Sequence, residues 1–246
     1  MPSAESGVAD LRAFAQSRIF FGHQSVGSNI LDGITGLYAA AETSGPLVVE
    51  SADATGSGPS LVHTHVGTNA DPYSKIDDFA AMTDGLDADW SGFLVLKLCF
   101  ADVHAATDID AVLSRYTDHL SETARRLPRA TIMPTTVPIT VDRGWKGKLN
   151  TLRRRDVHFR PADNVARHRY NESIRLRYRS TGRLFDIAQA QAGEYGGAAR
   201  LRRSAGLPYA VLRADFASDA GHLNTLGARA VASEFIRVIA ANSPRQ

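Results

Sequence analysis

The chain has 246 residues, of which 43% are hydrophobic and 22% are charged, and its formal net charge is +2. This composition is that of an ordinary globular protein, and the length suits one large α/β domain over residues 1–246. The net charge is too small to indicate a nucleic-acid partner by itself. Because Cys99 is the single cysteine, an internal disulfide framework and a zinc-type cysteine cluster are excluded.

Membrane insertion is not indicated by any segment. No apolar run approaches the roughly 20 residues that a membrane span requires. Residues 1–14 are polar with acidic members, and they lack the basic, then apolar, then small-residue order of a signal peptide. We therefore expect a cytoplasmic protein, or an exported one whose leader peptide has been removed.

Strand-like and helix-like segments alternate along the chain. Helical spacing of apolar residues predicts helices over residues 8–16, 25–41, 74–82, 109–127, 164–179 and 224–241. Apolar runs bounded by turn residues predict strands over residues 19–21, 46–51, 61–67, 92–100, 130–139 and 183–187. Such alternation is typical of a mostly parallel sheet covered by helices on both faces, so we predict a flavodoxin-like, three-layer αβα sandwich.

Three polar residues are candidates for catalysis at the sheet edge where ligands bind, beyond the carboxyl ends of the strands. Ser25 follows the first predicted strand, while Asp219 and His222 lie three residues apart just before the last helix. A serine hydroxyl is a poor nucleophile at neutral pH unless an imidazole accepts its proton, and a carboxylate can orient that imidazole. The sequence therefore predicts a Ser-His-Asp triad formed by the two ends of the chain.

Two motifs resemble blocks of the SGNH or GDSL hydrolases. "FFGHQSVGSNI" is similar to the block that holds the nucleophile, and "DAGHLNTLG" is similar to the aspartate-x-x-histidine block. Weaker similarity lies in "PTTVPI" and "YNESIRLRYRSTGRLFDIAQ", so that in order and spacing the resemblance covers most of the chain. It implies an SGNH-hydrolase-like fold and serine esterase activity, with Ser25 as nucleophile, His222 as base and Asp219 orienting the base.

The turn before Ser25 departs from the family pattern. Family members read glycine, aspartate, serine, whereas this chain reads Gly22, His23, Gln24, Ser25. His23 and Gln24 either contact substrate or satisfy the end of the strand. The alternative role for Ser25 is that of a helix N-cap, a position that serine favours.

The oxyanion hole departs further from the family. The resemblance implies donors from the Ser25 amide, a glycine that Gly67 matches, and an asparagine in the third block. In "LKLCFADV", Asp102 matches that block's aspartate, but Ala101 stands where the asparagine is expected. Loss of one oxyanion donor costs roughly 100-fold to 1000-fold in turnover. Asn69 is the candidate replacement, with a turn residue in "TNADP" as its alternative role.

Histidines near predicted strand ends raise the alternative of a metal site. His63 and His65 alternate along a strand and share one face, and His23 and His104 also lie near strand ends. No ordered ligand motif accompanies them, so we predict neither a metal nor a cofactor. Two other residues near a strand end have structural interpretations: Cys99 as a core residue, and Lys97 as the ion-pair partner of Asp102.

Residues 143–183 form a strongly basic segment, with 13 lysines and arginines against three acidic residues. The favoured interpretation is a solvated helix face and a surface insertion. An anionic substrate, such as an acidic sugar, and adventitious polyanion binding are the alternatives. No groove-entering or base-stacking motif is present, so we predict no nucleic-acid partner.

Together these observations predict a serine esterase that removes acyl groups, such as acetyl, from a glycan or another small hydroxylated substrate. One rival is an O-acyltransferase with the same site. The other is an inactive SGNH-like protein that binds a glycan or a partner, which the missing asparagine at Ala101 favours.

Overall fold

The computed structural model describes residues 4–142, 158–193 and 201–244. A five-stranded parallel sheet has the strand order β2-β3-β1-β4-β5. Its strands are β1 (Arg18–His23), β2 (Val48–Glu50), β3 (Ser60–His65), β4 (Gly92–Leu96) and β5 (Ala130–Met133). Because β1 lies between β3 and β4, the three chain segments that leave these strands meet at one edge of the sheet.

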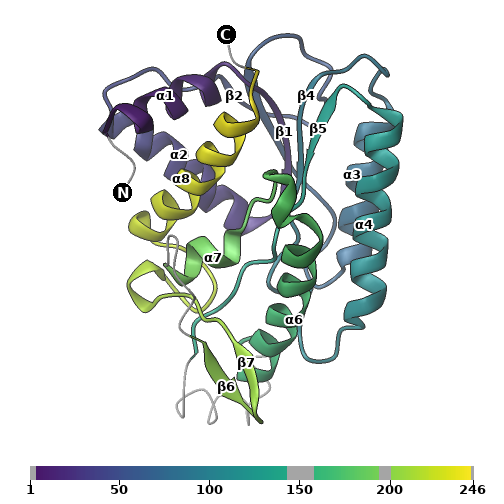
Figure 1. Cartoon of the computed structure of the whole chain (residues 1–246), viewed down its shortest axis with the longest axis vertical. Coiled ribbons are helices and arrows are strands. Elements are labelled where there is room, and N and C mark those ends of the chain that lie inside the picture. The colour runs from purple at the N-terminus through teal and green to yellow at the C-terminus, as the bar shows by residue number, and fades with distance from the viewer. Residues whose placement is uncertain (1–3, 143–157, 194–200, 245–246) are drawn as a thin grey trace.

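Helices cover both faces of the sheet, as the prediction required (Figure 1). One face carries α1 (Ala4–Ala15), α2 (Ser25–Ala40), α7 (Ile187–Ala192) and α8 (Thr225–Asn242). The other face carries α3 (Pro72–Asp84), α4 (Ile109–Arg126) and α6 (Pro161–Tyr178). The fold is thus an α/β three-layer sandwich, and the predicted fold class is confirmed.

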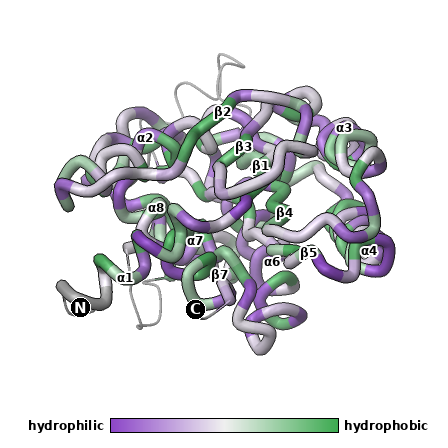
Figure 2. The backbone as a smooth tube through the Cα atoms, turned by 90° about the horizontal axis from the view of Figure 1, so that it is seen from above, coloured by the Kyte–Doolittle hydropathy of each residue, from purple (hydrophilic) through white to green (hydrophobic). Residues whose placement is uncertain are grey.

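Two adjacent phenylalanines of β1 show how the sheet separates two cores. Successive strand residues point to opposite faces. Phe20 stacks on Phe79 of α3, with ring centroids 5.4 Å apart, while Phe21 packs against Phe235 of α8, also at 5.4 Å. Each fully buried phenylalanine contributes about 1.5–3 kcal/mol. Figure 2 shows the matching pattern, with hydrophobic segments at the central strands and hydrophilic ones along the outer helix α4.

Side-chain caps fix where several helices begin. Asp71 accepts the Ser74 amide at the start of α3, and Asn224 accepts the Leu226 and Gly227 amides at the start of α8. Both residue types are favoured at this position. The same helix starts lie directly beside the candidate site, so the caps also position the loops that precede them.

Several elements differ from the prediction. The strand predicted over residues 92–100 ends at Leu96, because the chain turns where the Asp102 carboxylate accepts the Cys99 amide. The strand predicted over residues 183–187 is reduced to one parallel bridge between Thr135 and Phe185, after which Asp186 caps α7. Not predicted were α7, the hairpin of β6 (Arg202–Ser204) and β7 (Leu207–Tyr209), and the 3-10 helices η1 (Arg179–Thr181) and η2 (Ala214–Phe216).

Part of the basic segment has structural partners. Arg160 pairs with the buried Asp163 at the start of α6, and Arg169 pairs with Asp110 of α4 at the surface. Arg167, in contrast, is fully buried. Residues 143–157, which carry the other basic residues of the predicted insertion, lie outside the described residues. Within the described ranges, no helix combines the length and the apolarity needed to cross a membrane.

Candidate active site

Three predicted residues form one continuous chain of hydrogen bonds. The Ser25 hydroxyl oxygen lies 2.9 Å from His222 Nε2. The other ring nitrogen, Nδ1, lies 2.7 Å from Asp219 Oδ2. Since a carboxylate accepts and Nδ1 donates, Nε2 of the neutral imidazole is free to accept the Ser25 proton. The structure therefore brings together Ser25, His222 and Asp219 in the order that proton transfer requires.

A tight loop holds Asp219 and His222 in place. Asp219 Oδ1 accepts the amides of Gly221 and His222, each at 2.8 Å. Burial alone would raise the pKa of Asp219, but these bonds and the His222 ring lower that pKa below its usual value. The next amide, Leu223 N, donates to Asn29 Oδ1 of α2 at 3.1 Å, which ties the loop to the helix that carries Ser25.

Ser25 is the first residue of α2 and does not cap it. The N-cap is Gln24, whose side chain makes no capping bond, and the Ser25 hydroxyl is directed to His222 instead. The N-cap interpretation of Ser25 is therefore wrong. The first amides of a helix have no partner inside the helix, and the helix dipole favours negative charge beside them. The Ser25 amide is thus suited to bind an oxyanion.

His23 and Gln24 make hydrogen bonds within the protein at the end of β1. The His23 side chain is fully buried, so it does not line a substrate site. Its Nδ1 donates to the Gln24 carbonyl at 3.0 Å, and its Nε2 lies 3.1 Å from His63 Nδ1. Burial lowers the pKa of His23 to about 3, which keeps the ring neutral. A Cβ at Gly27 would lie 2.3 Å from the His23 ring, so glycine is required there.

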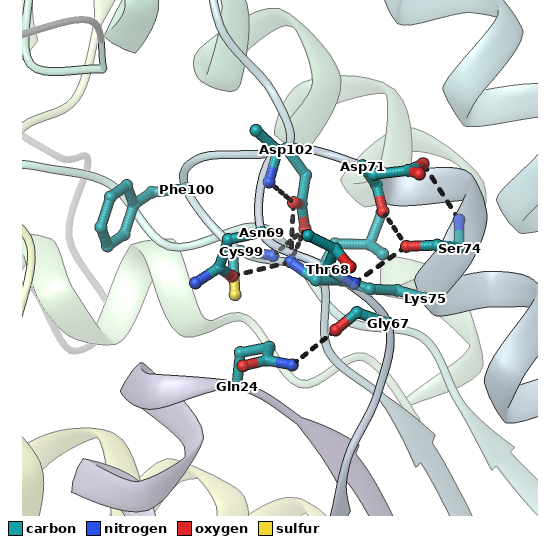
Figure 3. Close-up of polar contacts among 12 residues, drawn as sticks. Gln24, Gly67, Thr68, Asn69, Asp71, Ser74, Lys75, Cys99, Phe100 and Asp102 are labelled. Atoms are coloured by element: carbon teal, nitrogen blue, oxygen red, sulfur yellow. Dashed lines mark hydrogen bonds and ion pairs between the residues drawn. The ribbon is translucent and has the colours of Figure 1, made fainter.

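Gln24 joins the nucleophile turn to the loop after β3. Its side-chain Nε2 donates to the carbonyls of Val66 and Gly67, at 2.8 and 3.0 Å. Figure 3 shows this side chain below and to the left of Gly67, with a dashed line to the Gly67 carbonyl. The side-chain nitrogen of Gln24 therefore has two acceptors within the protein. The role of Gln24 in this arrangement is to position the loop.

The remaining histidines lie in two separate places, and the His65 ring lies beside the His23 ring, with centroids 4.9 Å apart. His65 pairs with Glu50 at 3.3 Å, and the His104 ring lies against His158, with centroids 5.3 Å apart. In the described ranges, no group of three or more histidine, cysteine, aspartate or glutamate residues is arranged to hold a metal ion.

Gly67 does not supply the donor that we expected. Its amide donates to Asp78 Oδ2 at 2.8 Å, so this N–H already has a partner. Gly67 has φ of +49°, and a Cβ there would lie 2.5 Å from the Lys75 amide nitrogen. The glycine is required by the tight turn, and the proposed contact of its amide with substrate is wrong in this arrangement.

Asn69 has its side chain exposed at the same loop. Its Oδ1 accepts a hydrogen bond from Lys75 Nζ at 3.1 Å. In Figure 3 the amide nitrogen points away from Lys75, toward the side on which Phe100 lies. That nitrogen donates to no residue in the described part of the chain, so it is available to a ligand. Phe100 in turn contacts the His222 ring edge to face, with centroids 5.9 Å apart.

Asp102 is buried, and its carboxylate accepts hydrogen bonds from inside the protein. Lys75 Nζ donates to its two carboxylate oxygens at 2.7 and 2.8 Å, and both side chains are fully buried. The expected pair of Asp102 with Lys97 is therefore wrong. Lys97 Nζ faces the Leu98 carbonyl and Cys99 Sγ at 3.4 and 3.5 Å, and burial lowers its pKa. Cys99 is buried, as predicted.

Sequence reasoning missed residues that shape the site. Phe100 packs against Phe159 as well as His222, which gives the site an apolar wall. Behind it the buried Arg167 donates to the Phe100 carbonyl at 2.8 Å, and burial lowers the pKa of its guanidinium to about 10. Lys75 was missed because one lysine in "DPYSKIDDF" carries no sign that it is buried. The acidic partner that neutralises it comes from another strand end.

Comparisons with known proteins extend the description of the fold. No protein-family model matches the chain, and no curated protein matches it. A solved structure of a Streptococcus pneumonia protein, provisionally assigned as a platelet activating factor, is similar with a TM-score of 0.54 and 13% identity, covering 94% of this chain and 91% of that chain. A lipopolysaccharide acetyltransferase periplasmic domain of Salmonella ser. Paratyphi A has a TM-score of 0.44 and 11% identity, covering 93% and 86%. The first similarity supports the three-layer fold.

Proposed function

We propose that the chain is a serine ester hydrolase, similar to the SGNH hydrolases, that removes acyl groups such as acetyl from a glycan or another small hydroxylated substrate. The observation that carries this proposal is the unbroken sequence of contacts from Asp219 through His222 to Ser25, at 2.7 and 2.9 Å. The half-buried position of Ser25 at the carboxyl edge of the sheet adds support, because ligands of parallel α/β folds bind there.

In the first step Ser25 Oγ attacks the ester carbonyl while His222 Nε2 takes the hydroxyl proton. The imidazolium is stabilised by Asp219, which accepts from Nδ1. When the tetrahedral intermediate collapses, His222 returns the proton to the alkoxide and the alcohol leaves. The acyl group then remains bonded to Ser25.

In the second step His222 takes a proton from water, whose oxygen attacks the acyl carbon. Collapse of the second tetrahedral intermediate breaks the bond to Ser25, and the proton returns to Oγ. The products are the free alcohol and the acid, and the site is regenerated without a cofactor.

Two donors would hold the oxyanion. The Ser25 amide lies at the start of α2, where the helix dipole favours negative charge. Asn69 Nδ2, on the loop that Gln24 clamps to the nucleophile turn, would take the place of the asparagine that Ala101 replaces. Preorganised donors of this kind stabilise charge that develops in the transition state.

The test is fluorophosphonate labelling and short-chain ester hydrolysis with the wild-type protein, Ser25→Ala and Ser28→Ala. Ser25→Ala should lose labelling and hydrolysis while keeping its melting temperature. Ser28→Ala is the matched control on the same helix and should keep both activities. Labelling that survives in Ser25→Ala would place the nucleophile elsewhere and overturn the proposal. A competing alcohol in the assay tests hydrolysis against transfer, since an acyltransferase would form a new ester.

A further inference from the structure

The loop that follows β3 is held by hydrogen bonds to two elements, α3 and the nucleophile turn. The Gly67 amide donates to Asp78 at 2.8 Å and the Thr68 amide to Ser74 Oγ at 2.9 Å, and both acceptors belong to α3. From the opposite side Gln24 donates to the Gly67 carbonyl at 3.0 Å. The backbone that leads into Asn69 is therefore held in one conformation before any ligand binds.

The residue after Asn69 has a strained backbone. Ala70 has φ of +68°, a left-handed conformation that costs a residue with a Cβ roughly 1–2 kcal/mol. Its amide donates to Asp102 Oδ1 at 3.0 Å. Strain of this kind persists only where the surroundings impose it. Asp102 therefore helps to hold the turn that presents the Asn69 side chain.

Lys75 determines which way the Asn69 carboxamide faces. An ammonium group has three N–H donors and no acceptor, and those of Lys75 match two oxygens of Asp102 and Oδ1 of Asn69. Only the carbonyl oxygen of the carboxamide can face such a group, so Nδ2 must face the other way (Figure 3). Donation from a cation to Oδ1 also polarises the carboxamide and strengthens Nδ2–H as a donor.

On the basis of the proposed function, we propose that Lys75, held by Asp102, is a positioning residue that orients and polarises the Asn69 carboxamide as an oxyanion donor. The side chains of Lys75 and Asp102 are fully buried, so in this proposal they act through Asn69 and not by touching substrate. The pair would thus compensate for Ala101, where a side-chain donor is missing, by presenting a donor from a different loop. Its contribution should appear in kcat, where transition-state contacts act, and only through Asn69.

A double-mutant cycle on ester hydrolysis tests this proposal with Asn69→Ala, Lys75→Met and the double variant. Lys75→Met should lower kcat by about 10-fold or more with KM changed by less than about threefold. In the Asn69→Ala background the same change should lower kcat by less than about twofold, because the group through which it acts is already gone. Equal losses in the two backgrounds would overturn the proposal.

Two further variants separate positioning from general destabilisation. Arg175→Met breaks a different largely buried ion pair, with Asp186, and should lower stability without lowering kcat. Lys75→Gln keeps a donor for Asn69 without the charge, so its kcat should lie between those of wild type and Lys75→Met. It also serves as the test if Lys75→Met does not fold. If the kcat of Lys75→Gln were no higher than that of Lys75→Met, or if it equalled the wild-type value, the proposal would be contradicted.

A measurement on the wild-type protein needs no buried substitution. The Asn69 side-chain amide, assigned in an ¹⁵N NMR spectrum by its loss in Asn69→Ala, should have an order parameter of about 0.8, whereas a value below about 0.6 would show a mobile group and overturn the proposal. A different result would contradict the proposed function: a wild-type protein that neither hydrolyses esters nor reacts with the fluorophosphonate. The NMR result is independent of that outcome.

Discussion

Two ion pairs of this region differ in burial. His222, which contacts Ser25, pairs with Asp219, and their side chains are 35% and 56% exposed. Lys75 of α3 and Asp102, after β4, pair at 2.7 Å with no exposure of either side chain. An exposed pair contributes little to stability, whereas removal of one member of a buried pair leaves an uncompensated charge. Under the proposed function, the exposed pair, the acid–base side of the site, would transfer protons near water, and the buried pair would give rigid support to the donor loop.

The largest effect should come from the acid–base side. His222→Ala should lower kcat for ester hydrolysis by about 10⁴-fold or more, because Ser25 loses the base that accepts its proton. Steady-state kinetics measures this loss, and thermal unfolding should show little change since the ring is partly exposed. Near-normal turnover in this variant would assign the base to another group.

The free energy of unfolding should depend more on the buried pair than on the exposed pair. Lys75→Met should lower the free energy of unfolding by about 3–5 kcal/mol, because Asp102 would remain charged and buried. Asp219→Asn, at the exposed pair, should lower it by about 1 kcal/mol or less. Urea unfolding of both variants measures the difference. Similar losses in the two would contradict the division of roles between the two sides.

Asn69 should matter for turnover and little for folding. Asn69→Ala should lower kcat by about 100-fold with little change in KM, which is the pattern of a contact made mainly in the transition state. Its exposed side chain predicts a small effect on the melting temperature. Thr68→Ala, at the preceding exposed position, is the control and should have wild-type kinetics. A structural asparagine would instead lower stability and leave kcat nearly unchanged.

The smallest effect concerns acid stability beside the nucleophile turn. Burial lowers the pKa of His23 from 6.5 to about 3, so between these pH values the unfolded chain binds a proton that the folded chain does not. The contribution of His23 is therefore fully present above pH 6.5 and is lost as the pH falls toward 3. Lowering the pH from 6.5 to 5 should cost about 2 kcal/mol.

Urea unfolding of wild type and His23→Gln across that range measures the effect. His23→Gln should lose stability less steeply as the pH falls, whatever its stability at neutral pH. Parallel curves for the two proteins would show that His23 is not held neutral in the fold.

The sequence by itself determined the layered fold and which three residues, Ser25, His222 and Asp219, form one chain of hydrogen bonds. The spacing of apolar residues predicts each strand and each helix locally. A parallel sheet then follows because alternating strands and helices can bury their apolar faces in that arrangement. The pairing of Asp219 with His222 could be predicted because both residues lie in one short loop, and Ser25 because its strand ends just before it.

Only the tertiary structure decided what lies on the buried side. The partner of Asp102 is Lys75, 27 residues earlier, and not the nearby Lys97, because α3 brings Lys75 to the turn that follows β4. In the same way the Gly67 amide donates to Asp78, in the second turn of α3. Hydrogen bonds and ion pairs between distant segments depend on directions and distances that the sheet imposes after the chain has folded, and no local spacing in the sequence encodes them.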